Sequence, residues 1–194
     1  MSSQRSIWKI VVRQGLLSLL VVAVLFLCLA GLLQLRWQLR WGADVLDQGE
    51  QVQLRALGKE ALRSNDVPVS ALLKYGTETI GEGFNTVARD GNAGGHAEIN
   101  AISDAIHRAG FTQFMALDRD SLRLVSTYEP CPMCRGALLE YRITHVEFLK
   151  GKSFWYHVKE GFRLFGYRWR MEAVEPAALQ DSLFVMHPAH RRVD

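Results

Sequence analysis

The order of apolar and polar residues separates an apolar N-terminal segment from a body of mixed character. Residues 15–33 read GLLSLLVVAVLFLCLAGLL, an uncharged run long enough to cross the hydrocarbon core of a bilayer as one helix. Because a helix satisfies its own backbone in an apolar medium, this run predicts a transmembrane helix within a membrane anchor over residues 1–35. Trp8 precedes the run and Trp37 and Trp41 follow it, as is typical of aromatic residues at a membrane interface.

A cleaved signal peptide and a buried core helix are the alternatives for this run. Arg5, Lys9 and Arg13 precede it, and the Cys-Leu-Ala sequence at 28–30 resembles a cleavage site. The apolar run continues beyond that site to Leu33, so we expect an uncleaved anchor. The basic residues near the two ends are almost balanced, so the sequence does not decide on which side of the membrane the body lies.

The body alternates segments of strand and helix character. Residues 43–64 combine apolar residues at helical spacing with charges, which predicts an amphipathic helix within a juxtamembrane segment, residues 36–66. This helix is either a stalk or the first helix of the following domain. Strands are predicted at 67–75, 77–84, 122–127 and 144–149, and helices at 95–109 and 131–141.

This order of elements predicts the fold class. A hairpin followed by strand–helix–strand units indicates an α/β fold, because helices must cover both faces of such a sheet. We therefore expect a three-layer α/β/α sandwich with a mixed central sheet over residues 67–150, preceded by one transmembrane helix.

Composition and charge exclude several classes of protein. Of the 194 residues, 48% are hydrophobic and 22% charged, which excludes a disordered or low-complexity chain. Three cysteines are too few for a secreted disulfide scaffold. The formal net charge of +3 comes entirely from residues 1–35, since the remainder has 20 basic and 20 acidic residues. A neutral body argues against a long nucleic-acid footprint.

Two short motifs, each at the start of a predicted helix, contain metal-ligand residues. The sequence is GHAE around His96 and PCPMC around Cys131 and Cys134. Thiols three residues apart on a helix project to the same side, and a helix N-terminus favours their thiolate form. Two thiolates and one imidazole leave a tetrahedral zinc with one open position, which is the arrangement of a catalytic site. Glu98 can then exchange protons with a water whose pKa the zinc lowers.

Each motif alone has an ordinary explanation. The cysteine pair could be a redox dithiol or two buried side chains, and His-Ala-Glu could be surface sequence without a role. Together they are more specific, because a redox pair explains neither His96 nor Glu98. A closed structural zinc site needs a fourth ligand, which no remaining histidine offers at an obvious spacing.

His96-Ala97-Glu98 followed by the Pro-Cys-Pro-Met-Cys run resembles the cytidine and deoxycytidylate deaminase superfamily, whose signature is H-x-E…P-C-x-x-C. The resemblance covers about residues 67–150. It implies that Zn²⁺ is held by His96, Cys131 and Cys134 and that Glu98 is the catalytic proton shuttle. Water would then replace an exocyclic amine of a nucleobase, nucleoside or nucleotide, a purine or pyrimidine, and ammonia would leave.

The Gly-Glu-Gly-Phe-Asn run at 81–85 resembles the branch of tRNA adenosine deaminases and guanine deaminases. The resemblance implies that Asn85 hydrogen-bonds the substrate base and that the backbone of Ala97 approaches the substrate or the metal-bound oxygen. An ordinary turn residue is the alternative for Asn85. A homodimer is a further expectation at this level.

Two alternatives to this activity remain open. The first is an RNA adenosine-editing deaminase, which the neutral body does not favour. The second, from another class, is a catalytically silent, membrane-tethered zinc-binding interaction module.

Residues 148–170, which run into a C-terminal extension at 151–194, are rich in aromatic and basic side chains. They hold eight of the 19 aromatic residues, and six basic residues against one acid, Glu160. A helix that packs its rings on the core, a surface for a bilayer and a surface for a nucleotide or nucleic acid all fit this pattern. We expect the extension to pack on the core, and the sequence leaves the other two uses open.

Overall fold

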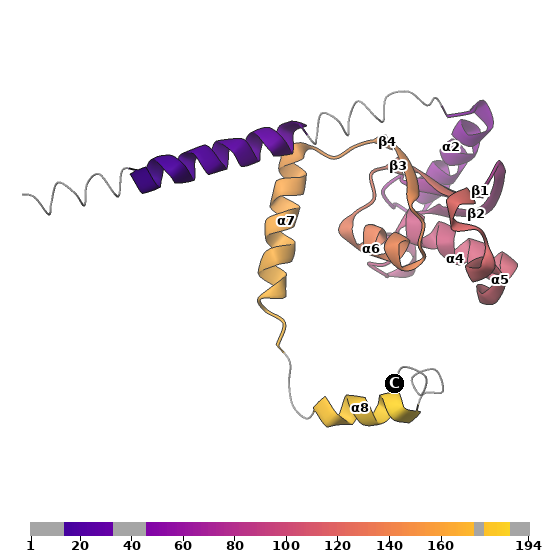
Figure 1. Cartoon of the computed structure of the whole chain (residues 1–194). Helices are drawn as coiled ribbons and strands as arrows, with labels where there is room; N and C mark the ends of the chain where they lie inside the picture. Colours follow the sequence, from indigo (N-terminus) through magenta and orange to yellow (C-terminus); the bar gives the residue numbers. More distant parts are fainter. Residues whose placement is uncertain (1–13, 33–45, 173–176, 187–194) are drawn as a thin grey trace, which may run out of the picture. The chain divides into compact units, whose positions relative to one another are not determined.

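The computed structural model of the chain describes residues 14–32, 46–172 and 177–186 (Figure 1). It contains two compact units, Met1–Leu149 and Lys150–Asp194, which are described separately below. The basic and tryptophan residues that flank the apolar run in the sequence lie outside the described residues. They are Arg5, Trp8, Lys9, Arg13, Arg36, Trp37, Arg40 and Trp41.

The first unit is built on a four-stranded sheet with the order β2-β1-β3-β4. β1 (Ser70–Tyr75) pairs antiparallel with both β2 (Glu78–Phe84) and β3 (Leu122–Tyr128). A helix connects β3 to β4 (His145–Lys150), and such a crossover joins parallel strands. The predicted mixed sheet is therefore confirmed, and its strands lie within three residues of the predicted bounds.

Helices cover both faces of the sheet, which confirms the predicted three layers (Figure 1). α4 (Ala97–Ala109) and α6 (Pro132–Glu140) pack with Leu73 and Leu124 in the larger core. On the other face, α2 (Gln48–Arg63) buries one leucine against the sheet. That leucine, Leu54, contacts Leu72 and Val125. Of the two alternatives for residues 43–64, the structure thus shows a helix that packs on the sheet.

Two short helices were not predicted. α3 (Val87–Asp90) and α5 (Phe111–Ala116) are four and six residues long. A helix of one or two turns is too short to produce a recognisable apolar period. α3 lies in the connection from β2 to α4, so it bears directly on the site described below.

Close contact between β2 and α4 depends on two glycines. A Cβ at Gly83 would lie 2.2 Å from the carbonyl oxygen of Ala97 and 2.4 Å from the amide nitrogen of Ala101. A Cβ at Gly81 would lie 2.2 Å from the carbonyl oxygen of Ala101. Real side chains essentially never approach backbone so closely, so both positions require glycine. The helix that carries the GHAE motif therefore rests directly on the strand backbone.

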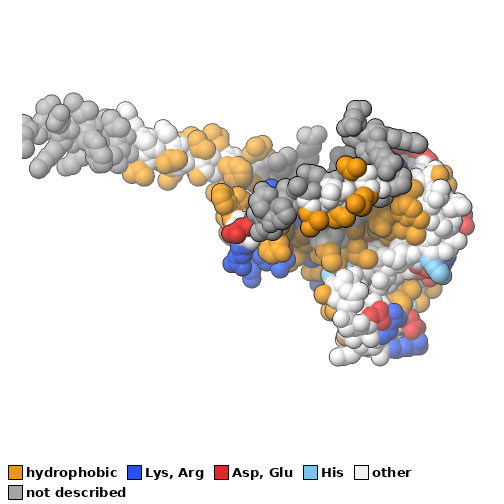
Figure 2. All heavy atoms as spheres, turned by 90° about the horizontal axis from the view of Figure 1, so that it is seen from below, with side chains coloured by type: hydrophobic (Ala, Val, Ile, Leu, Met, Phe, Trp, Pro, Cys, Tyr) orange, Lys and Arg blue, Asp and Glu red, His pale blue; other side chains and the backbone are white. Residues whose placement is uncertain are grey.

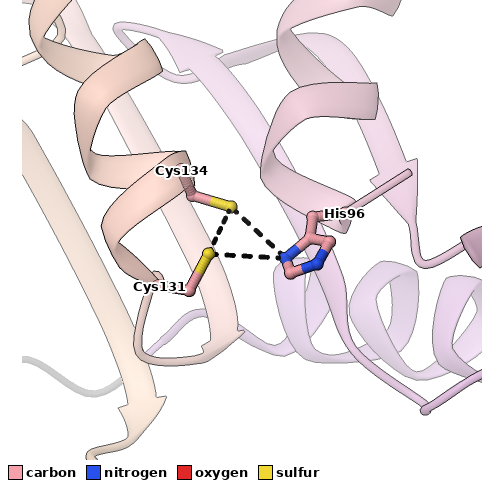
Figure 3. Close-up of side chains that lie close together, drawn as sticks. All are labelled: His96, Cys131 and Cys134. Carbon is pink, nitrogen blue, oxygen red and sulfur yellow. Dashed lines mark hydrogen bonds between the residues drawn. The ribbon is translucent and has the colours of Figure 1, made fainter. Parts of the chain in front are cut away.

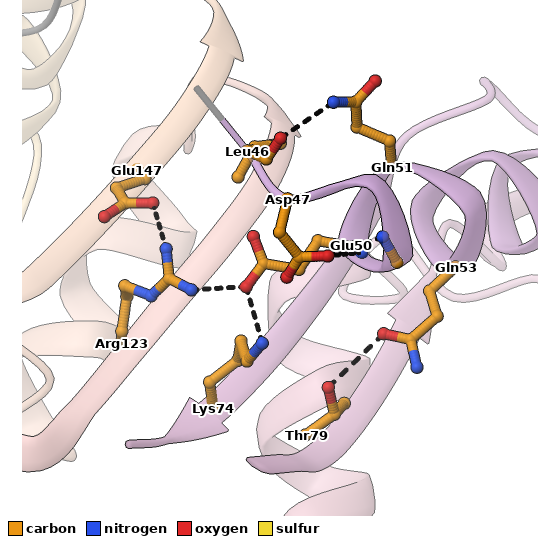
Figure 4. Close-up of polar contacts among 10 residues, drawn as sticks. Leu46, Asp47, Glu50, Gln51, Gln53, Lys74, Thr79, Arg123 and Glu147 are labelled. Atoms are coloured by element: carbon orange, nitrogen blue, oxygen red, sulfur yellow. Dashed lines mark hydrogen bonds and ion pairs between the residues drawn. The ribbon is translucent and has the colours of Figure 1, made fainter. Parts of the chain in front are cut away.

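A buried ionic network joins α2 to the sheet (Figure 4). Lys74 and Arg123 are opposite each other on β1 and β3, so their side chains share one face of the sheet. The Glu50 carboxylate lies between these two cations and accepts a hydrogen bond from each. The Lys74 Nζ–Glu50 Oε1 distance is 2.5 Å, and Arg123 also donates to Glu147 at 2.6 Å. Glu50 and Lys74 are only 4% and 5% exposed, so Glu50 compensates a charge buried in the sheet.

The described part of the N-terminal segment is one helix, Gln14–Leu32. Its mean hydropathy is 2.8, and hydrophobic side chains cover it in the space-filling view (Figure 2). None of it is buried in the chain, which excludes the core-helix alternative among the described residues. By length and composition it can cross a membrane, and a signal sequence fits the same description.

The second unit contains α7 (Phe154–Arg168) and α8 (Ala177–Met186). Ser153 caps α7, its hydroxyl accepting a hydrogen bond from the backbone N–H of Tyr156 at 3.2 Å. The predicted packing of residues 151–194 on the core stays a prediction.

Candidate active site

His96 stands at the N-terminus of α4 without capping it. Its backbone is extended (φ −85°, ψ 148°), and its side chain makes no hydrogen bond to the first turn of the helix. Asn85, which follows β2, supplies the missing acceptor: its Oδ1 accepts a hydrogen bond from the Ala97 N–H at 2.9 Å. Because another residue satisfies the helix terminus, the His96 imidazole is available to face a metal.

The connection between β2 and α4 is fixed at several points. The Thr86 N–H donates to the Gly95 carbonyl at 2.8 Å, which brings the two ends of the connection together. Asn100, one turn into α4, donates from Nδ2 to the Phe84 carbonyl at 2.7 Å. These bonds hold the backbone before and after His96 against the strand end.

Asp66, which follows α2, also stabilises the connection between β2 and α4 by hydrogen bonds. Its carboxylate accepts hydrogen bonds from the N–H groups of Ala88 and Arg89, at 2.6 Å and 3.2 Å, and from the Ser64 hydroxyl at 2.8 Å. Burial alone would raise the pKa of Asp66, but these hydrogen bonds outweigh it and lower the pKa below its ordinary value. Asp66 lies 22 and 23 residues before Ala88 and Arg89 in the chain, so no local sequence signal identifies these two bonds.

The two cysteines lie at the N-terminal end of α6. Cys131 is the residue before the helix and accepts the first backbone hydrogen bond, from the Arg135 N–H at 2.9 Å. The first helical position is Pro132, whose missing N–H is no loss there. Pro130 lies two residues before this position. Cys134 is fully buried, whereas Cys131 and His96 are partly exposed.

The three predicted ligands converge although 35 residues separate His96 from Cys131 (Figure 3). The two Sγ atoms are 3.5 Å apart, and His96 Nδ1 lies 3.6 Å from Cys131 Sγ and 3.5 Å from Cys134 Sγ. A tetrahedral ion with zinc–sulfur bonds near 2.3 Å and zinc–nitrogen bonds near 2.0 Å separates its ligands by about 3.5–3.8 Å. The donor atoms are thus spaced as zinc requires.

The two thiols are electrostatically unequal. The hydrogen bond between the two sulfurs is the main cause that lowers the pKa of Cys131, to about 5, and His96 adds to it. The same contact and burial beside Glu98 raise the pKa of Cys134. The lowered pKa of Cys131 favours its thiolate, and a divalent cation would displace the proton of Cys134.

Glu98 lies beside this group without being one of its ligands. Within the described part of the chain, the group comprises only His96, Cys131 and Cys134. Glu98 is 3% exposed, and its Oε2 accepts a hydrogen bond from Cys134 Sγ at 3.4 Å. Burial raises the pKa of Glu98 above its ordinary value. A buried carboxyl with a raised pKa beside a group of metal-ligand residues is suited to exchange protons with a neighbouring molecule.

The structure therefore brings together all six residues that the sequence singled out. Asn85 and Ala97 are bonded to each other, and His96, Glu98, Cys131 and Cys134 form the polar group beside them. Sequence reasoning missed Asp66, Thr86 and Asn100, which shape the connection before α4.

Comparison with known proteins identifies a zinc-binding family for most of the first unit. Residues 49–150 match the profile of the cytidine and deoxycytidylate deaminase zinc-binding region. A tRNA(Ile)-lysidine synthase of Deinococcus radiodurans is 40% identical over 94 residues, which are 48% of this chain and 15% of that protein. The tRNA-specific adenosine deaminase 2 of Xenopus laevis is 34% identical over 93 residues, 47% of this chain and 53% of that protein. The chain thus spans about half, or less, of the length of these relatives.

A solved structure supports the fold. The guanine deaminase of Bacillus subtilis superposes with a TM-score of 0.52 at 21% identity, and the match covers 73% of this chain and 94% of that one. At this identity the similarity concerns the fold alone. The three-layer arrangement described above therefore has a counterpart in a solved structure.

Proposed function

The chain belongs to the cytidine and deoxycytidylate deaminase family, and from this premise we propose that it is a zinc-dependent hydrolase that releases ammonia from a nucleobase, nucleoside or nucleotide. The observation that carries the proposal is the convergence of His96, Cys131 and Cys134 with a buried Glu98 at their side. Three protein ligands are the number found in catalytic zinc sites, whereas structural sites have four.

Each residue of the group has a distinct role in this proposal. Zinc held by the imidazole and the two sulfurs supplies Lewis acidity and lowers the pKa of a water molecule. Glu98 accepts a proton from the attacking water and delivers it to the departing amine, for which its raised pKa is suited. Burial of Glu98 excludes bulk water from this exchange.

Asn85 is the proposed contact to the base. Its Oδ1 is engaged by the Ala97 N–H, which fixes the orientation of the amide and leaves its Nδ2 as the donor for an acceptor atom of the ring. Ala97 contributes by holding Asn85, because its own N–H is occupied by that bond. A purine is the first expectation, since relatives similar to this chain are named for adenosine and guanine deamination.

The RNA alternative is favoured by a separate observation. The curated relatives quoted above are a tRNA-specific adenosine deaminase and a tRNA(Ile)-lysidine synthase. The substrate panel described below therefore includes an adenosine-containing RNA stem-loop beside the free purines.

We further propose that the helix Gln14–Leu32 is an uncleaved anchor, supported by its length and its mean hydropathy of 2.8. Intact mass measurement of the protein extracted from membranes tests this. The full mass supports the anchor, and a chain shortened near residue 30 contradicts it.

Ammonia release from a panel of compounds tests the activity. The full chain in detergent is assayed with guanine, adenine, cytosine, their nucleosides and nucleotides, and the RNA stem-loop. The same protein stripped of metal by a chelator, and then restored with zinc, is the matched control. Release from one class of compound that disappears with the metal and returns with zinc supports the proposal. A zinc-loaded protein that releases no ammonia from any compound contradicts it and favours the silent module.

A further inference from the structure

α7 has one apolar face composed largely of aromatic rings. At 3.6 residues per turn, six of its apolar side chains fall within an arc of about 100°, and Leu164 lies outside this arc. The members of this face are Phe154, Trp155, Val158, Phe162, Phe165 and the adjoining Trp169, which continues the helical turn. Trp155, Phe162 and Trp169 are 74%, 74% and 75% exposed, and Phe165 is 64% exposed.

Cations border this face on both sides. By the same helical spacing, Lys159 lies about 40° beyond one margin of the arc, and Arg168 lies about 40° beyond the other. Arg163 is farther round the helix, where its guanidinium donates to Glu160 at 2.8 Å. Lys152, just before the helix, places its ammonium 5.0 Å from the centre of the Tyr156 ring. The helix is thus apolar along one side and positively charged along the margins of that side.

A lipid bilayer surface matches both features. An interfacial helix buries a Trp- and Phe-rich face at the boundary of headgroups and acyl chains, and basic residues beside that face meet anionic headgroups. Tryptophan in particular is favoured at this depth. A soluble protein rarely leaves so many adjacent rings exposed unless the surface has a binding role.

A second observation on the same chain points to the same partner. The helix Gln14–Leu32 is apolar on all sides and unburied, so lipid is the medium that suits it. The body, residues 36–194, carries no net charge. The basic residues of α7 therefore form a local patch and do not belong to an extended surface for binding a polynucleotide. Local positive charge next to an exposed apolar face fits a membrane surface better than RNA.

We propose that α7 is an interfacial membrane helix, which lies along an anionic bilayer surface with Phe154, Trp155, Phe162, Phe165 and Trp169 toward the acyl chains. The second unit then attaches the protein to the membrane at a site distinct from the N-terminal helix. This inference concerns α7 alone and does not depend on the proposed deaminase activity.

Tryptophan fluorescence of the full chain tests the proposal. Trp8, Trp37 and Trp41 are replaced by Phe, so that Trp155 and Trp169 remain as reporters of α7 among the five tryptophans of the chain. The protein is reconstituted into vesicles of phosphatidylcholine with or without phosphatidylglycerol, each containing acyl-brominated lipid. We expect bromolipid to quench the emission, and to quench it more in vesicles with phosphatidylglycerol. That excess should fall in 1 M salt, where the Debye length shrinks to about 3 Å.

Two matched substitutions separate the proposed face from the rest of the helix. Phe165 and Tyr167 are equally exposed, at 64%, but by helical spacing only Phe165 is on the apolar face. We expect Phe165→Asp to abolish the quenching and Tyr167→Asp to retain it, although both variants keep the N-terminal helix and the same charge. Equal quenching in the two variants overturns the proposal, as does absence of quenching in the parent. A change in emission caused by an RNA stem-loop or by self-association at high protein concentration, without bromolipid quenching, also overturns it.

Discussion

The backbone N–H of Ala97 donates a hydrogen bond to Oδ1 of Asn85 at 2.9 Å, which links the end of β2 to the start of α4. This bond caps the helix that carries His96 and Glu98, although twelve residues separate its two partners in the chain. It makes Asn85 both a structural cap and the candidate contact to the base.

Substitutions at Asn85 should separate these two roles. Asn85→Ala removes the acceptor, and we expect a loss of about 1–2 kcal/mol in the free energy of unfolding. Asn85→Asp retains an acceptor at a helix N-terminus, where negative charge is favoured, so its stability should stay near that of the parent. Both variants lose the amide donor and should lose ammonia release. Urea unfolding and the ammonia assay measure the two effects. Equal destabilisation by Ala and Asp would show that the cap role is wrong.

Gly83 should not accept a side chain. A Cβ there would lie 2.2 Å from the Ala97 carbonyl oxygen, so Gly83→Ala must move α4 away from β2. We expect a loss of about 1–3 kcal/mol or more in unfolding free energy, together with reduced zinc affinity. Gly136→Ala in α6 is the matched control, since nothing lies within 4 Å of its Cβ position. Helix propensity predicts that it is neutral or stabilising by up to about 1 kcal/mol. Similar effects of the two substitutions in thermal unfolding would contradict the close contact.

The buried network around Glu50 should be sensitive to the loss of its carboxylate. Glu50→Gln leaves Lys74 buried in the sheet without its countercharge, which typically costs about 3–5 kcal/mol. Glu60→Gln on the same helix is the control, because its pair with Arg63 is exposed and such pairs contribute about 0–1 kcal/mol. Denaturant unfolding followed by circular dichroism compares the two. A loss below about 1 kcal/mol for Glu50→Gln would mean that the network is not needed to hold α2.

Sequence reasoning found what was encoded in short or regular patterns. The mainly apolar run at 67–75 and the stripe at 95–109 were sufficient to predict β1 and α4, and the histidine and cysteine motifs were sufficient for the metal group. Lys74 was not recognised as buried, because a lysine in a strand ordinarily faces solvent and its countercharge lies 24 residues earlier. Likewise, neither Asp66 nor the bond between Asn85 and Ala97 has a signature, because each joins segments that only the folded chain brings together.

Asp66 should make the stability of the folded protein depend on pH in acidic solution. Its pKa is lowered in the folded chain because its hydrogen bonds outweigh the effect of burial. The stabilisation is therefore fully present above the unfolded pKa of about 3.9, and it is lost as the pH falls through the lower folded pKa. Asp66→Asn removes this titration, so the melting temperature of the variant should change less with pH below about 4 than that of the parent. If the melting temperatures of the two proteins fall equally steeply with pH between about pH 2 and 4, the role of Asp66 is refuted.

The most direct test of the account is ammonia release by Glu98→Gln at matched zinc content, measured on the best substrate of the panel. Glutamine keeps the size of the side chain, and Glu98 is not one of the three grouped metal donors, so the variant should bind zinc as the parent does. We predict unchanged zinc stoichiometry and a rate lowered by about 10²–10⁴-fold, the usual contribution of a general acid–base group. A zinc-loaded variant that releases ammonia at the parental rate would contradict the assignment of Glu98 and, with it, the proposed catalytic site.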